Sequence, residues 1–131
     1  EYLEDLCADF EDIAFVASRT GMPVALDELL AQGKAWEPIP QLRALVLKPT
    51  LLGSLTRCEA LVARARELRL KVIVSSCFES GVGLGQLARL AGEWAPDQAP
   101  GLDTRRWLAG DLLDPQGQPD PGKMEPLFHR D

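Results

Sequence analysis

Short apolar runs that alternate with longer amphipathic segments are the feature that most constrains this chain. The runs over residues 24–26, 42–47 and 71–74 are rich in Val, Leu and Ile, and they are too short to be buried helices. The segments between them are long enough for helices. Because short buried strands separated by helices are typical of βα units, we predict an α/β fold with a parallel sheet. Both an open doubly wound sheet and part of a (β/α) barrel fit this alternation.

The spacing of apolar residues predicts where the helices lie. We expect helices over residues 9–20, 55–70 and 82–94, and a shorter helix-like segment over residues 29–32. The helix over residues 55–70 is expected to bury Leu61, Ala65 and Leu68.

Turn and cap residues add detail at the ends of these elements. Gly21 suits the left-handed position after a helix, and Ser54 is an expected N-cap. Residues 101–104 are a candidate for the end of a last short strand. Residues 114–126 are rich in Pro, Gly and Asp, and we expect them to be irregular.

Composition excludes several classes of protein. Of the 131 residues, 46% are hydrophobic, and the net charge of −6 comes from acids and bases mixed along the chain. No apolar run approaches the roughly 20 residues that a membrane-spanning helix needs. The charge argues against nucleic acid as the main partner and is compatible with a bound cation. We therefore expect neither a nucleic-acid partner nor a membrane partner.

Cysteine and histidine usage narrows the chemistry. The three cysteines, Cys7, Cys58 and Cys77, are far apart and form no CxxC pattern, so we expect a cytoplasmic protein without disulfides or a zinc site. The only histidine, His129, lies near the end of the chain, where a catalytic triad is improbable. The glycine-rich stretch over residues 81–85 lacks the charged partners of a nucleotide site.

Polar residues repeatedly follow the apolar runs. Glu4 follows the short apolar pair Tyr2-Leu3. Asp27 and Lys48 follow the runs over residues 24–26 and 42–47, and Ser75 and Ser76 follow the run over residues 71–74. The carboxyl ends of parallel strands open onto one face, where α/β enzymes hold their active sites. Taken singly, an acidic residue here often caps the next helix, and a Lys before Pro is often an ordinary loop residue. Their recurrence favours a shared site.

The chemistry of these groups indicates a metal-assisted reaction. Glu4 and Asp27 are oxygen ligands suited to Mg²⁺ or a similar divalent cation such as Mn²⁺, with a third ligand expected on a preceding strand. At the end of a strand Lys48 should be partly desolvated, which predicts a lowered ammonium pKa. A metal beside a Lys is one arrangement for abstracting a proton next to a carboxylate.

Several motifs together carry a resemblance to a known family. They are Leu3-Glu4-Asp5, residues 25–28, Lys48-Pro49-Thr50 within residues 47–54, Ser75-Ser76 with Glu79-Ser80 within residues 75–83, and residues 100–104. In this order they resemble the C-terminal half of the o-succinylbenzoate synthases of the enolase superfamily. The resemblance implies that residues 1–113 form the C-terminal portion of a (β/α) barrel. An irregular Pro/Gly-rich tail would occupy residues 114–131.

The resemblance also implies an activity, a carbon-oxygen lyase reaction. The family dehydrates 2-succinyl-6-hydroxy-2,4-cyclohexadiene-1-carboxylate to 2-succinylbenzoate for menaquinone biosynthesis. By resemblance, Glu4 and Asp27 are two of three magnesium ligands, and Lys48 is the second active-site lysine, opposite the proton-abstracting one. Ser75 and the backbone of Gly101 would hold the substrate. The implied roles of Ser76 and Cys77 are to line the pocket less directly.

Two departures from the family pattern matter. Glu4-Asp5-Leu6 stands where relatives often have Glu-Glu-Pro or Glu-Gln-Pro, and the Lys-x-Lys strand and first Asp ligand have no counterpart. The chain also opens without Met or a signal peptide. Since a barrel needs about 250 residues, we expect a piece of a larger enzyme. Alone it should be inactive, and its partner would be the missing N-terminal portion.

Other interpretations stay open. An N-acylamino-acid racemase of the same superfamily would use a similar site. Dipeptide epimerases are disfavoured, because Gly101-Leu102-Asp103 stands where they carry Asp-x-Asp. A non-catalytic half-barrel fragment and an unrelated flavodoxin-like binding domain are the remaining alternatives.

Overall fold

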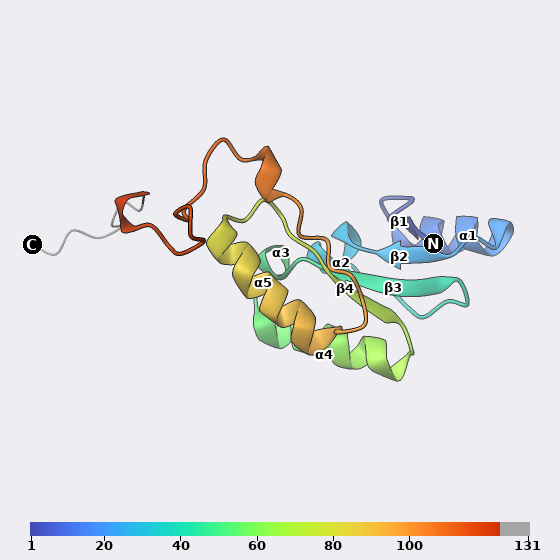
Figure 1. Ribbon diagram of the computed structural model, residues 1–131. Helices are drawn as coiled ribbons and strands as arrows, with labels where there is room; N and C mark the ends of the chain where they lie inside the picture. Colours follow the sequence, from blue (N-terminus) through green and yellow to red (C-terminus); the bar gives the residue numbers. More distant parts are fainter. Residues whose placement is uncertain (124–131) are drawn as a thin grey trace, which may run out of the picture.

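Four parallel strands form one sheet in sequence order (Figure 1). The computed structural model describes residues 1–123. Its strands are β1 (Leu3–Glu4), β2 (Val24–Leu26), β3 (Leu42–Leu47) and β4 (Lys71–Val74). Every neighbouring pair is parallel, and Gly101 adds one further parallel bridge to Ser75 beyond β4. The predicted parallel α/β fold is confirmed.

Helices connect the strands. They are α1 (Phe10–Thr20), α2 (Glu28–Ala31), α3 (Pro49–Leu52), α4 (Leu55–Glu67) and α5 (Gly81–Trp94), followed by the 3₁₀ turns η1 (Arg105–Trp107) and η2 (Pro121–Lys123). Both α4 and α5 contact β4, and they pack on the same side of the sheet (Figure 1). Each connection therefore returns the chain over one face to start the next parallel strand.

The main hydrophobic core lies between that face of the sheet and the helices. Its most buried large side chains include Ile13 of α1, Leu26 of β2, Leu45 and Leu47 of β3, and Val74 of β4. The opposite face carries a second, smaller cluster. It consists of buried Ala25, Ala44 and Val46, with Tyr2 and Ile73 packed against them. Small side chains suit the crowded inner side of a curved sheet.

Several local expectations are confirmed. Gly21 ends α1 with a left-handed φ of 70°, and its N–H donates to the Ala17 carbonyl. The Ser54 hydroxyl caps α4 by accepting a hydrogen bond from the Arg57 N–H at 3.2 Å. Each cap supplies a partner or a backbone conformation that a helix end needs.

Other expectations are wrong in detail. In α4 the buried residues are Cys58, Val62 and Ala65. Ala65 is buried as expected, whereas Leu61 and Leu68 are only partly buried. The helix ends at Glu67, and Arg69 then adopts a left-handed φ of 56°. The short helix α3 was not expected, because one turn beginning with Pro has too few residues to show a period.

The end of the chain is only partly ordered into regular elements. Of residues 101–104, only Gly101 pairs with a strand. Residues 114–123 contain the 3₁₀ turn η2, and Pro119 forms an antiparallel bridge with Leu113 just before this range. The rest of the expected irregular tail, with His129, lies outside the described residues.

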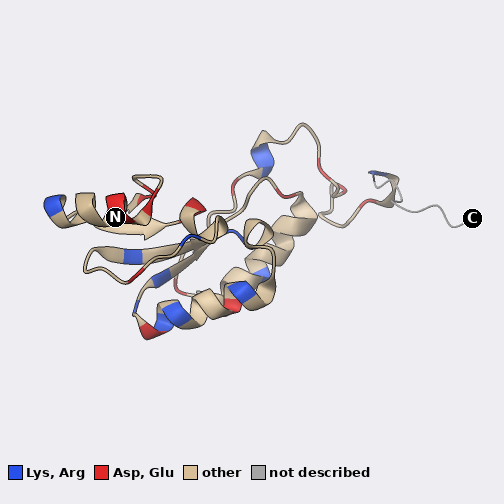
Figure 2. Ribbon diagram, turned by 180° about the vertical axis from the view of Figure 1, so that it is seen from behind, with Lys and Arg blue, Asp and Glu red and all other residues tan. Residues whose placement is uncertain are grey.

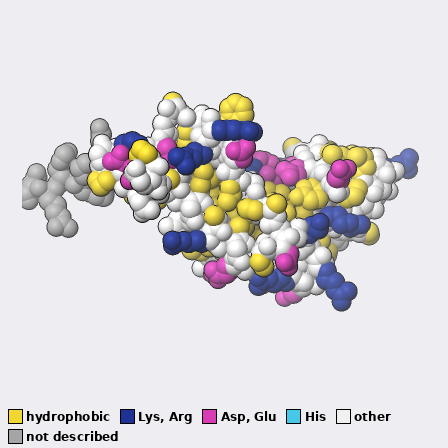
Figure 3. Space-filling view, viewed as in Figure 1, with side chains coloured by type: hydrophobic (Ala, Val, Ile, Leu, Met, Phe, Trp, Pro, Cys, Tyr) yellow, Lys and Arg dark blue, Asp and Glu magenta, His cyan; other side chains and the backbone are white. Residues whose placement is uncertain are grey.

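The charged residues are spread over many elements. Figure 2 shows both signs along the chain, with Lys and Arg gathered on α4. In the view of Figure 3, hydrophobic side chains cover the middle of the face and most basic side chains lie around its margins. Within residues 1–123, no helix has the length and apolar character that crossing a membrane requires.

Candidate active site

The alternation of side chains along each strand brings the predicted site residues to one face. Glu4, Asp27, Lys48 and Ser75 each lie two positions after a residue of the smaller cluster, namely Tyr2, Ala25, Val46 and Ile73. Since side chains two apart in a strand share a face, all four start from the face opposite the main core. They stand where the parallel strands end, and of the four only Asp27 and Lys48 are in direct contact within residues 1–123.

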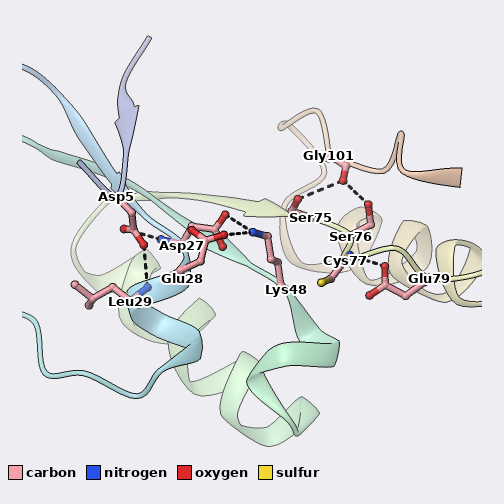
Figure 4. Close-up of polar contacts among 10 residues, drawn as sticks. All are labelled: Asp5, Asp27, Glu28, Leu29, Lys48, Ser75, Ser76, Cys77, Glu79 and Gly101. Atoms are coloured by element: carbon pink, nitrogen blue, oxygen red, sulfur yellow. Dashed lines mark hydrogen bonds and ion pairs between the residues drawn. The ribbon is translucent and has the colours of Figure 1, made fainter. Parts of the chain in front are cut away.

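Lys48 and Asp27 form the central contact (Figure 4). Lys48 Nζ lies 2.6 Å from Asp27 Oδ2 and 2.7 Å from Glu28 Oε1. The Asp27 side chain is 6% exposed and that of Lys48 is 16% exposed, whereas Glu28 reaches in from solvent. Two consecutive carboxylates from the β2–α2 turn therefore hold one ammonium from the end of β3.

The two carboxylates reverse the pKa shift that the sequence predicts for Lys48. Burial alone would lower the ammonium pKa, but the hydrogen bonds to Asp27 and Glu28, together with their charges, raise it above its ordinary value. The predicted lowering is therefore wrong for this arrangement. Burial raises the pKa of Asp27, although Lys48 opposes the shift, and the hydrogen bond from Lys48 lowers the pKa of Glu28. At neutral pH Lys48 carries a full positive charge.

The oxygens of Asp27 and Glu4 bear on a cation site. Asp27 Oδ1 is buried and has no hydrogen-bond partner among residues 1–123. Glu4 is exposed, and after burial its negative charge is a smaller cause of the raised Asp27 pKa. A carboxylate oxygen with no partner among residues 1–123, at the end of a strand whose neighbour ends in a second carboxylate, fits a hard divalent cation that takes its other ligands from water or substrate. Within the described residues, no group of three His, Cys, Asp or Glu side chains forms a metal site.

Ser75, Ser76 and Gly101 form a second polar group at the end of β4. The Gly101 carbonyl accepts hydrogen bonds from Ser76 Oγ at 3.0 Å, the Ser76 N–H at 2.9 Å and Ser75 Oγ at 3.3 Å. Ser76 also accepts a bond from Thr104 Oγ1 and is buried. A Cβ on residue 101 would stand 3.0 Å from Ser75 Oγ, so the close approach favours Gly. Ser75, half-buried, is the more accessible hydroxyl.

Sequence reasoning assigned no role to three carboxylates that hold this site together. Glu28 binds Lys48. Glu79 accepts hydrogen bonds from Thr50 Oγ1 at 2.5 Å and from the Cys77 N–H at 2.6 Å, which ties α3 to the loop after β4. The carboxylate of Asp5 accepts two backbone N–H bonds from the β2–α2 turn. All three stand within the quoted motifs, which was the available signal, but no motif indicates which backbone or ammonium group each carboxylate binds.

Solved structures identify the class of fold. The L-Ala-D/L-Glu epimerase of Bacillus subtilis matches 87% of the chain with a TM-score of 0.68 and 19% identity, over 33% of its own length. MenC from Desulfotalea psychrophila matches 87% of the chain with a TM-score of 0.70 and 22% identity, over 34% of its length. No family model matches the chain. These similarities show the fold, a parallel α/β arrangement that corresponds to about a third of each of these longer chains.

Curated relatives with higher sequence identity share one enzyme name. The chain is similar to the o-succinylbenzoate synthase of Haemophilus influenzae, with 38% identity over 86% of the chain and 37% of that enzyme. It is 36% identical to the synthase of Pasteurella multocida, over 100% of the chain and 39% of the enzyme. The synthase of Pectobacterium atrosepticum is 43% identical over 79% of the chain and 32% of the enzyme. The resemblance to o-succinylbenzoate synthase is confirmed, along about a third to two fifths of the length of these relatives.

Proposed function

We propose that this chain is the C-terminal part of an o-succinylbenzoate synthase. The reaction would be the dehydration of 2-succinyl-6-hydroxy-2,4-cyclohexadiene-1-carboxylate to 2-succinylbenzoate in menaquinone biosynthesis. One observation carries the proposal. A lysine and a carboxylate, Lys48 and Asp27, meet at the carboxyl ends of parallel strands in a chain related to these enzymes.

The residues of the site have separate tasks in this proposal. Glu4 and Asp27 would hold Mg²⁺, or a similar ion such as Mn²⁺, which supplies positive charge for a developing ene-diolate. Lys48 stays protonated, and its ammonium would stabilise the negative charge of a substrate carboxylate or ene-diolate. Glu28 remains a partner for Lys48 when Asp27 binds a cation. The Ser75 hydroxyl would orient the substrate, while Ser76 and Gly101 shape the loop beside it.

We further propose that an N-terminal portion of the same enzyme completes the site. It would supply the Lys-x-Lys base and the first Asp ligand, and without it the chain should be inactive. Two observations support this. β1 lies at the edge of the sheet with only two residues in register with β2, and the matched relatives are two to three times longer than the chain. An open strand edge pairs readily with a further strand.

The proposed setting is a cytoplasmic reaction on a small carboxylate, with no nucleic acid and no membrane as partner. The free state of Cys7, Cys58 and Cys77 suits a reducing compartment. The net charge of −6 disfavours a nucleic-acid backbone.

A direct assay tests the proposal. The full-length protein containing this chain is purified, and dehydration is followed with Mg²⁺ and after chelation. We expect turnover that chelation abolishes and that Lys48→Ala lowers by about 100-fold or more. A full-length protein that racemises an N-acyl amino acid and does not dehydrate would be the racemase instead. Turnover by the 131-residue chain alone would contradict the need for an N-terminal portion.

A further inference from the structure

Asp5 holds the turn that carries Asp27. Its Oδ1 accepts a hydrogen bond from the Asp27 N–H at 3.1 Å, and its Oδ2 accepts one from the Leu29 N–H at 2.8 Å (Figure 4). These donors belong to the start of α2, where a helix leaves its backbone N–H groups without partners inside the helix. Asp5, the residue after β1, therefore binds the helix start as an N-cap side chain usually does from within its own segment.

The contacts of Asp5 affect the carboxylate of Asp27, which occupies the N-cap position of α2. An Asp at this position usually turns its own carboxylate to the first backbone donors of the helix. Here the Asp27 side chain makes no such bond. Because Asp5 already binds the Leu29 donor, the Asp27 carboxylate is left to contact Lys48 through Oδ2, while Oδ1 has no partner within residues 1–123.

The backbone of Asp5 is held in an uncommon conformation. Its φ is 32°, in the left-handed region that L-residues other than Asn and Asp rarely adopt. The Asp5 N–H donates to the Ala25 carbonyl at 3.2 Å, so the strained residue is tied to β2. This conformation lets the chain leave β1 while the side chain turns under the β2–α2 turn. Strain of this kind persists where the surrounding structure over-determines it, often beside functional sites.

We propose that Asp5 is a positioning residue, which keeps the Asp27 carboxylate off its own helix and directed to the cation and Lys48. This inference rests on the proposed function, since it concerns the same site. Asp5 acts through Asp27 and need not touch the substrate. Without the second Asp5 oxygen, one N–H at the start of α2 would lack its acceptor, and the carboxylate of the N-cap residue Asp27 is of the type that usually replaces it.

The test compares Asp5→Asn and Asp5→Ser in the full-length protein. Each replacement keeps one short-range acceptor and removes the second. Asp12→Asn is the control with the same charge change as Asp5→Asn, at an exposed position on α1. Mn²⁺ affinity is measured by electron paramagnetic resonance, kcat and KM by the dehydration assay, and folding by thermal unfolding. We expect about a 10-fold to 100-fold rise in the Mn²⁺ Kd and a fall in kcat, with little change in KM. Asp12→Asn should match the parent.

The outcomes separate this inference from the proposed function. A parent that neither binds Mn²⁺ nor dehydrates the substrate would sink the proposed function. Folded Asp5 variants with the parent's Mn²⁺ Kd and kcat would overturn the role of Asp5 alone. If neither Asp5 variant folds while Asp12→Asn does, Asp5 is a structural residue and the inference is wrong.

Discussion

Lys48 and Asp27 form an ion pair of 2.6 Å at the junction of two neighbouring strands, with 16% and 6% of their side chains exposed. Exposed ion pairs contribute little to stability, because water screens both charges. A mostly buried pair behaves differently, since the removal of one partner leaves the other charge desolvated and alone. The contact therefore couples the stability of this face to the chemistry proposed for it.

Replacing Lys48 with Met should destabilise the full-length protein by about 3 kcal/mol, because Asp27 would keep a buried charge with no partner. Urea unfolding measures the change. The matched control is Lys34→Met, whose ion pair with Asp9 is exposed and should be worth less than about 1 kcal/mol. Equal losses for the two variants would contradict the importance of burial.

The same ion pair should produce a pH dependence in the alkaline range. The folded state raises the pKa of Lys48 above its ordinary value of 10.5. A raised lysine pKa stabilises the fold fully below the ordinary value, and this contribution is lost as pH rises through 10.5 toward the higher folded value. The difference in unfolding free energy between the parent and Lys48→Met should therefore shrink above that pH. If this difference in unfolding free energy grew with rising pH, the assigned direction of the Lys48 pKa shift would be wrong.

Asp111 should contribute to the stability of the fold at acidic pH and to the order of the first residues of α5. Its Oδ1 accepts a hydrogen bond from the Gly81 N–H at 2.7 Å, and Oδ2 lies 2.6 Å from Arg105 Nε. The Gly81 N–H lowers the pKa of Asp111 below 3.8, so the stabilisation is present above that value and lost as pH falls through the lower folded pKa. Asp111→Asn should remove part of the acid-dependent stability and speed amide exchange at Gly81. Asp97→Asn, at an exposed position, should change neither.

The Glu79 contacts predict a local effect on the segment that carries Lys48. Thr50→Val keeps the side-chain shape but removes the hydroxyl that donates to Glu79. We expect a loss of about 1 kcal/mol and faster amide exchange over α3. Thr56→Val is the control, because Thr56 is exposed on α4. If exchange over α3 is unchanged in Thr50→Val, the bond between Thr50 and Glu79 does not brace this segment.

Local patterns were sufficient for most of the fold. The apolar runs predicted β2, β3 and β4, and Gly21 and Ser54 ended or began helices as expected. The buried face of α4 was predicted incorrectly, because its apolar and small residues form two possible stripes that are related by a small rotation about the helix axis. Packing on the sheet selected the stripe with Cys58 and Val62.

The electrostatics of the site could not be predicted in the same way. A Lys after a strand indicates partial burial, and burial alone lowers its pKa. The actual shift has the opposite sign, because Asp27 and Glu28 both reach Lys48 from another strand. No local pattern shows how many carboxylates will surround an ammonium.

By itself the sequence determined the parallel order of βα units and the face from which Glu4, Asp27 and Lys48 project. Both follow from short-range rules, namely the length of the apolar runs and the two-residue period of a strand. Only the tertiary structure decided how these groups are held, because the decisive contacts join distant parts of the chain. Asp5 accepts hydrogen bonds from backbone donors 22 and 24 positions away, and these two bonds leave the Asp27 carboxylate to contact Lys48.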